Sequence, residues 1–384
     1  MLIKHLEHLE DLIYNKKDFK QCMSILTKLN GLLFSQSNKI TTKSDGCISI
    51  VFGIHPLSKQ FFISTKSAFN KNAILCYTYS DIEKYFTRFV SENLSVCFKL
   101  LKNIVKTDDV YQADIFYNLH TKQYTDNGEI LFTPNLITYY IDKNHEDYDK
   151  IDNSVLGIAV HTKYTGIPVS ENSLEGMIPN VIDAYTEFNQ THSIYFINTS
   201  IKKYIKRYQV IYIDTEIIFD DNEFELLTKY KDLLKQFYNF SLKENISFEE
   251  KSFGTFIKHK VDKDLKKLKT DKSKQKCAQN YIDILLDFTL NKVVLQKYIH
   301  KYKSIQSTKN HMIDFLNSCE HHYDFQINGK ESGPEGYIFE HNDYTIKLVN
   351  REIFSKLNFE KHSNKGQKSW WMELKSIILL QLII

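Results

Sequence analysis

The spacing of apolar residues changes once along this 384-residue chain, and that change constrains the fold more than any other feature. Between residues 40 and 165, short apolar runs such as 48–52 alternate with polar connections, which predicts strands of a partly buried sheet. From about residue 222 to 319, apolar residues recur every three or four positions, which predicts long amphipathic helices. The sequence therefore predicts an α+β fold with a mainly helical module.

Other segments add to this pattern. Residues 1–35 carry apolar residues at helical spacing and predict two amphipathic helices, and another helical stretch is expected at about residues 81–105. Residues 170–190 have helical character, whereas residues 193–198 and 209–213 predict strands.

The turn before the first strong strand carries a candidate nucleophile. Lys43-Ser44-Asp45-Gly46 places an amine beside a carboxylate and a glycine. A lysine attacks a phosphoanhydride only when it lies near the phosphorus and is partly deprotonated, by burial or by neighbouring cations. The plainer interpretation is a hairpin turn, since Asp-Gly is a standard hairpin signal.

Two later strands carry single charged residues. Residues 61–69 predict a second strand that forms a hairpin with the first and ends near Lys66, so that Lys43 and Lys66 could approach one nucleotide. Residues 110–117 predict a strand whose one acid is Asp114. The alternative for Asp114 is a solvent-facing residue on an edge strand.

A similar combination lies near the other end of the chain. Glu335 is at a turn that opens one predicted strand, and Lys347 lies inside the next. Phosphoryl transfer needs a carboxylate to hold a divalent metal and cations to neutralise charge on the phosphate. The order and spacing of these segments are less common than each segment alone.

Taken together, the segments resemble the lysine-dependent nucleotidyltransferase superfamily of ATP-dependent polynucleotide ligases and capping enzymes. The resemblance follows Lys43-Ser44-Asp45-Gly46, Ser64-Thr65-Lys66, Ala113-Asp114, Glu335-Gly336-Tyr337-Ile338 and Ile346-Lys347-Leu348-Val349. Residues 5–12, 69–72 and 347–351 are also similar to an RNA-ligase-like group of bacteriophage proteins. The resemblance covers roughly residues 1–165 and 325–360.

The resemblance implies three catalytic roles. Lys43 would form the lysyl-AMP intermediate, Glu335 would bind the divalent metal, and Lys347 would hold the α-phosphate. Asp45, Gly46, Lys66 and Asp114 would complete the nucleotide site, and Asp114 would also contact the metal. The chain departs from the family pattern in two places, since Asp114 stands where Glu is usual and Val349 replaces a second lysine, for which Arg351 could substitute. A base-stacking aromatic is expected within residues 160–166.

The resemblance also implies the activity, an ATP-dependent polynucleotide ligase with Mg²⁺ or Mn²⁺ as cofactor. Lys43 would attack ATP, pass AMP to a 5′-phosphate, and a 3′-hydroxyl would displace it, as in RNA repair. RNA is preferred over DNA as the substrate, because about 35 residues follow the last motif, too few for an oligonucleotide-binding barrel. The alternatives are nucleotide transfer to another acceptor, as in capping, and a non-catalytic nucleic-acid-binding viral protein on a ligase scaffold.

The implied fold is a nucleotidyltransferase (ATP-grasp-like) domain of antiparallel sheets with a cleft, closed by an inserted helical module. The expected bounds are residues 1–200 with 325–365 for this domain, 201–324 for the insertion and 366–384 for a C-terminal tail.

Charge and cysteine content limit the partners. The net charge is only +3, so any nucleic-acid surface must be a local patch. The lysine-rich residues 259–276 predict a basic helix that is either a solvated face or a contact for a nucleic-acid backbone. Six scattered cysteines indicate neither a zinc site nor disulfides. No membrane span is expected, because the apolar segment 376–384 is too short to cross a bilayer. The expected location is the cytoplasm, which would be the host cytoplasm if the protein is viral.

Overall fold

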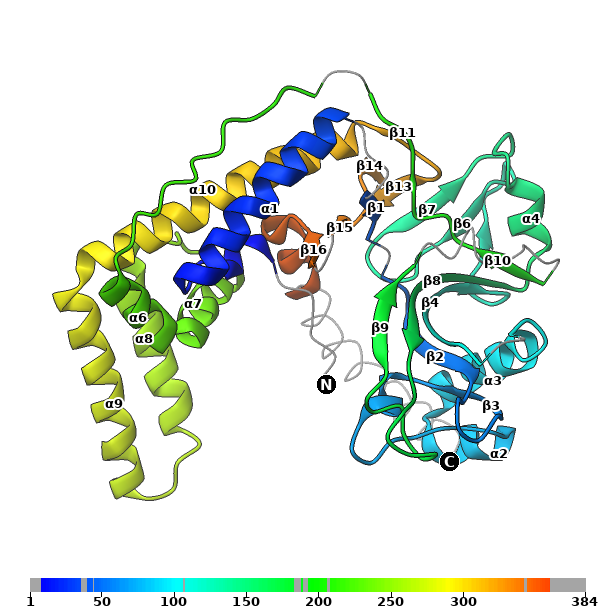
Figure 1. The fold of residues 1–384 in the computed structure, drawn as a ribbon, viewed down its shortest axis with the longest axis horizontal. Coiled ribbons are helices and arrows are strands. Elements are labelled where there is room, and N and C mark those ends of the chain that lie inside the picture. Colours follow the sequence, from blue (N-terminus) through cyan, green and yellow to red (C-terminus); the bar gives the residue numbers. More distant parts are fainter. Residues whose placement is uncertain are drawn as a thin grey trace, which may run out of the picture. The chain divides into compact units, whose positions relative to one another are not determined.

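The computed structural model describes residues 8–35, 40–43, 45–105, 108–182, 188, 193–205, 208–341 and 344–359. The chain divides into two compact units (Figure 1). The sheet unit contains residues 38–205 and 317–341, and the helical unit contains residues 7–37, 206–316 and 342–384. This division differs from the expected bounds because residues 7–37 and those after 341 group with the helices.

The largest sheet of the sheet unit has six strands in the order β10-β8-β4-β2-β3, with β9 beside β8. Neighbouring strands are antiparallel, except for the parallel pair β8 and β10. The strands are β2 (Ile48–Ile54), β3 (Phe61–Ser64), β4 (Val110–Asn118), β8 (Leu156–Thr165), β9 (Ile178–Val181) and β10 (Ile194–Phe196). The alternation of Ile48, Ile50 and Phe52 directs these side chains to one face, where they join a buried apolar cluster.

Two helices also contribute side chains to that cluster. They are α2 (Tyr79–Tyr85) and α3 (Arg88–Leu101), and their buried side chains include Ile82, Leu94 and Phe98. A capping box between Thr78 and Asp81 fixes the start of α2. The 3₁₀ helix η2 (Lys66–Phe69) follows β3. In the sheet itself, β4 is an interior strand, because it pairs with β2 on one side and β8 on the other.

A second antiparallel sheet has five strands in the order β14-β13-β7-β6-β5. Its strands are β5 (Gln123–Tyr124), β6 (Ile130–Phe132), β7 (Thr138–Ile141), β13 (Asp324–Ile327) and β14 (Lys330–Ser332). The short helix α4 (Tyr148–Asn153) precedes β8. Two further antiparallel pairs are β11 (Ile201–Lys203) with β12 (Glu320–His321), and β1 (Ile40–Thr42) with β15 (Tyr337–His341).

The helical unit is built on long amphipathic helices. They are α1 (Lys16–Ser35), α6 (Asp221–Lys229), α7 (Lys231–Lys243), α8 (Glu250–Leu265), α9 (Asp271–Leu290) and α10 (Lys292–Asn317), and the short 3₁₀ helix η1 (Leu9–Leu12) precedes α1. Strand β16 (Tyr344–Leu348) and a helix over residues 351–359 complete it. Its interior contains ion pairs: Lys309 Nζ lies 2.7 Å from Glu10 Oε1, with both side chains fully buried, and Arg351 Nη1 lies 3.2 Å from Asp11 Oδ1.

The α+β class with antiparallel sheets is confirmed. Of residues 170–190, where helical character is expected, residues 170–182 contain turns and β9, and residues 183–187 and 189–190 lie outside the described residues. The strand predicted at 209–213 is wrong, because residues 208–219 have no regular secondary structure. The lysine-rich segment is not one helix, because a turn at residues 266–270 separates α8 from α9. The expected C-terminal tail, residues 366–384, lies outside the described residues. None of the described helices has the length and apolar run that a membrane crossing needs.

Candidate active site

Lys43 is positioned by the pairing of two strands that are almost three hundred residues apart in sequence. β1 pairs with β15 in the register Thr42 opposite Tyr337. The ladder continues for one more hydrogen bond, in which the Lys43 amide donates to the carbonyl of Gly336 at 2.8 Å. Lys43 therefore lies beside the turn that carries Glu335.

The side chains of this turn meet at the Lys43 ammonium. Lys43 Nζ lies 2.8 Å from Glu335 Oε1 and 2.5 Å from Asp45 Oδ2. The Lys43 side chain is 15% exposed and that of Glu335 10%, whereas that of Asp45 is 41% exposed. A half-buried cation thus lies between one buried and one accessible carboxylate.

Burial and charge act against each other on both groups of the buried pair. Burial lowers the pKa of Lys43, but the carboxylates of Glu335 and Asp45 raise it by more, so the pKa is above its usual value. Burial raises the pKa of Glu335, and Lys43 offsets this only partly. With these partners Lys43 is an ammonium, so it needs a change in its surroundings before it can act as a nucleophile.

Gly46 connects this turn to the six-stranded sheet. A Cβ atom at Gly46 would lie 2.5 Å from the carbonyl oxygen of Ile115 and 2.7 Å from Cβ of Asp114. Such distances are too short for any side chain, so glycine is required by the close approach of the backbone to β4. The next residue, Cys47, donates its amide to the same Ile115 carbonyl at 2.8 Å and begins the ladder of β2. The Asp-Gly pair leads into a strand and does not form a hairpin turn.

Asp114 faces this glycine from inside the sheet. It lies on β4 opposite Ser49 of β2, and its side chain is 16% exposed, so the edge-strand alternative is wrong. The amide of Gly46 donates to Asp114 Oδ2 at 3.4 Å, and Nε2 of His161 lies 3.8 Å from Oδ1. Burial raises the pKa of Asp114, but His161, Ser49 and the Gly46 amide lower it by more, so the pKa is depressed.

His161 lies within residues 160–166, where a base-stacking aromatic is expected, but no sequence pattern predicts its position beside Asp114. It lies on β8 where the register to β4 shifts between Gln112 and Ala113. A bulge of this kind re-aims a side chain and leaves no signal in the apolar spacing. The expected stacking aromatic is not Tyr164, whose side chain is buried and donates its hydroxyl to Gln112 Oε1 at 2.7 Å.

The remaining predicted residues lie elsewhere. Lys66 is exposed at the start of η2, and the described residues provide its ammonium with no ion pair. Lys347 lies on β16 in the helical unit, so its approach to the phosphate beside Lys43 stays a prediction. The substitution of Arg351 for a second lysine is wrong, because its guanidinium is buried and contacts Asp11 and Tyr302.

The oxygens at the site suit a hard divalent cation. Magnesium is often held by one or two carboxylates together with substrate phosphates, and Glu335 and Asp45 meet at one point. Asp114 contacts Gly46 and His161 instead of this pair. Among the described residues, no group of three or more His, Cys, Asp or Glu side chains is arranged to bind a metal alone. A cation here would therefore need ligands from the substrate.

Comparison with protein families places the chain in a group defined by sequence. Residues 3–363 match the model described as "Family of unknown function (DUF6267)". The chain belongs to this family. No curated protein and no solved structure matches it. For this DUF6267 protein, function must therefore be argued from the site.

Proposed function

We propose that this DUF6267 protein is a nucleotidyltransferase that attaches AMP to Lys43 and passes it to a 5′-phosphate on nucleic acid, preferably RNA. The observation that carries the proposal is the half-buried Lys43 ammonium between Glu335 and Asp45, on a turn fitted against β4. A surface lysine in a hairpin turn would lack the buried carboxylate that Glu335 provides. The proposal is also supported by the order of the site segments in the sequence, which resembles that of lysine-dependent ligases.

In the first step, Lys43 Nζ forms a bond to the α-phosphorus of ATP. The bond from that phosphorus to the bridging oxygen breaks, and pyrophosphate leaves with the electron pair. The ammonium must first lose a proton, and both carboxylates lie within hydrogen-bond distance to accept it. Glu335 is the better acceptor because burial raises its pKa.

The fixed geometry contributes to this step in two ways. The backbone hydrogen bond from Lys43 to Gly336 holds the amine at one end of β15, which lowers the entropy lost when the reacting atoms are aligned. A divalent cation held by Asp45 and the substrate phosphates would supply positive charge to the phosphate oxygens, and Glu335 would join it as a ligand once its proton has left. Lys66 and Lys347 are proposed to add further positive charge when nucleotide binds.

A labelling experiment tests this proposal. The purified protein is incubated with Mg²⁺ and either α-labelled ATP or α-labelled GTP, and the label is followed on a denaturing gel. We expect AMP labelling that is lost in Lys43→Arg, which keeps the positive charge, and strongly reduced in Glu335→Gln. Lys99→Arg serves as the matched control, because Lys99 is an exposed lysine on α3.

The chemistry of the label gives a second criterion. A phosphoramidate on lysine is labile in acid and stable in alkali, and added pyrophosphate should remove it by reversing the step. Labelling by GTP alone would favour transfer to a capping-type acceptor. Absence of label with both nucleotides, in folded protein free of a prebound adduct, would refute nucleotidyl transfer.

A further inference from the structure

The most basic part of the chain is the tip of the hairpin formed by α8 and α9, which we call the hairpin tip and define as residues 263–276. These residues include seven lysines and two aspartates, a net charge of +5, whereas the whole chain has +3. The rest of the chain is therefore slightly acidic. This segment therefore offers a polyanion the largest local excess of positive charge among the chain's basic segments.

The hairpin itself is a rigid element. Figure 1 shows α8 and α9 side by side in the helical unit, joined by the turn at residues 266–270, which lies within the tip. Phe253 of α8 packs on Phe288 of α9 with ring centroids 4.9 Å apart, and Tyr281 donates its hydroxyl to Asp264 Oδ2 at 2.7 Å. Thr270 caps the start of α9 by accepting the amide of Ser273. The tip is thus a fixed presentation of charge.

Most of the positive charge at the tip is available to a partner. Asp264 is occupied within the hairpin, since Lys267 lies 3.0 Å and Lys260 3.7 Å from its carboxylate. The other lysines of the tip are exposed and make no ion pair with the described residues. They are Lys263, Lys266, Lys269, Lys272, Lys274 and Lys276.

The side chains at the tip favour a phosphate backbone over other acidic partners. The tip itself has no exposed large apolar side chain, and the exposed Ile282, Leu286 and Leu290 lie further along α9, outside it. Binding to a bilayer surface would use an apolar face beside the charges as an anchor. Lysine is depleted in protein–protein interfaces, whose centres are apolar. Six exposed ammonium groups without an apolar centre match a row of phosphates, where each contact releases a counterion.

We propose that the hairpin tip binds the sugar-phosphate backbone of the nucleic acid, without reading its sequence. The choice of nucleic acid as the physiological partner rests on the proposed function. Binding at the tip, however, needs neither ATP nor Lys43. The hairpin tip belongs to the helical unit, and none of its residues is among the site residues named above.

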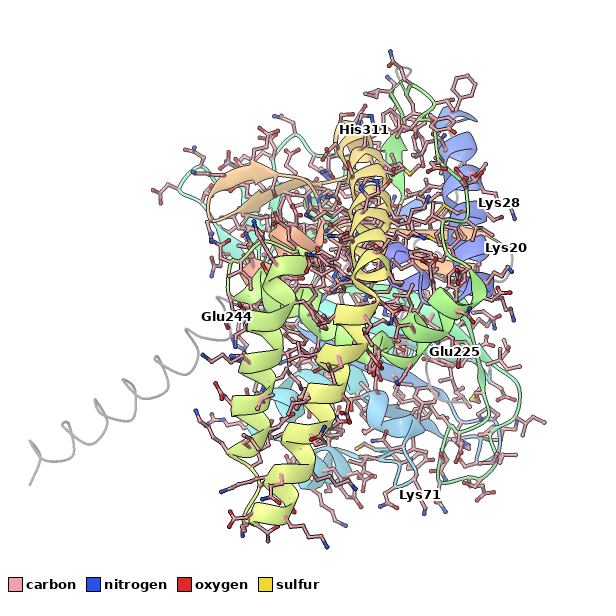
Figure 2. All side chains as sticks on the ribbon, turned by 90° about the vertical axis from the view of Figure 1, so that its left-hand side faces the viewer. Lys20, Lys28, Lys71, Glu225, Glu244 and His311 are labelled. Atoms are coloured by element: carbon pink, nitrogen blue, oxygen red, sulfur yellow. The ribbon has the colours of Figure 1, made fainter. Side chains whose placement is uncertain are left out.

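The test compares two triple variants of the full chain that lose the same charge. One is Lys266→Gln, Lys269→Gln and Lys272→Gln at the tip. The matched control is Lys17→Gln, Lys20→Gln and Lys28→Gln on α1, where all three lysines are exposed, and Figure 2 labels two of them. Binding to a 5′-phosphorylated single-stranded RNA is measured by fluorescence anisotropy without nucleotide, at several salt concentrations.

We expect the affinity of the tip variant for the RNA at low salt to be lower by a factor of roughly ten or more. Its slope of log K against log salt should be smaller in magnitude by about 2, as the loss of three phosphate contacts on a single strand predicts. The control variant should bind like the unmodified protein. Equal loss in both variants, or no loss in either, would overturn the proposal. Hairpin-dependent binding to vesicles of anionic phospholipid, as strong as to RNA, would overturn the choice of nucleic acid.

This experiment also separates the two proposals. Adduct formation is measured on unmodified protein without nucleic acid, and RNA binding is measured without nucleotide. An adduct without tip-dependent binding refutes only the inference on the hairpin. Tip-dependent binding without an adduct refutes only nucleotidyl transfer.

Discussion

His321 gives a quantitative prediction for the stability of the strand that carries the site. It lies on β12, and its Nε2 is 3.0 Å from the hydroxyl of Tyr337, which donates to Asn317 Oδ1. Tyr337 is the first residue of β15 and follows Glu335 by two positions. A change in the charge of His321 should therefore be transmitted to the strand beside Lys43.

Burial lowers the pKa of His321 from 6.5 to about 4, and this effect exceeds the opposing hydrogen bond to the Cys319 backbone. Between pH 6.5 and pH 4 the unfolded chain binds a proton that the folded protein does not. Stability is therefore full above pH 6.5 and is lost as the pH falls towards 4, below which both states are protonated. The pKa difference corresponds to about 3 kcal/mol.

Hydrogen exchange of the peptide that covers β12 and β15 measures this loss. We expect the opening free energy of that peptide to fall between pH 7 and pH 4 by about 3 kcal/mol more in the unmodified protein than in His321→Gln. The same replacement at the exposed His300 is the control. If His321→Gln and the unmodified protein lose the same free energy, or if NMR titrates His321 near pH 6.5, the reasoning is refuted.

Two further predictions concern close packing and a buried charge. Gly46→Ala should destabilise the protein by about 1–3 kcal/mol, because the new methyl overlaps the Ile115 carbonyl, and it should slow adduct formation. Gly31→Ala, with open space around it, is the control. Normal labelling by Gly46→Ala would contradict the close packing of the Lys43 turn against β4. Lys309→Met should cost about 3–5 kcal/mol in urea unfolding because it leaves Glu10 charged and buried. Adding Glu10→Gln should recover much of that loss, and a single variant as stable as the unmodified protein would show that the pair is dispensable.

The sequence predicted well those features that depend on neighbouring residues. The alternation in residues 48–52 and the apolar strand around Asp114 are local, and both segments form strands. The helical spacing after residue 222 is local too, and α6 to α10 follow it. In residues 209–213 the apolar alternation predicted a strand that the structure lacks, because a strand also needs a partner with unpaired backbone groups.

The geometry of the site depends on contacts that no local pattern encodes. The register of β1 against β15 sets the distance between Lys43 and Glu335, and it joins residues from opposite ends of the chain. His161 reaches Asp114 through a register shift in β8. The sequence places Arg351 two residues after Val349, where it could substitute for a second lysine, yet its position between Asp11 and Tyr302 is fixed by packing within the helical unit.

The most direct test of the account is the location of a nucleotide adduct on the protein. The protein is incubated with ATP and Mg²⁺, digested under alkaline conditions that preserve a phosphoramidate, and sequenced by tandem mass spectrometry. The account predicts AMP on Lys43 and on no other lysine. An adduct on a different residue, or folded protein that carries none after incubation and none when purified, would contradict it.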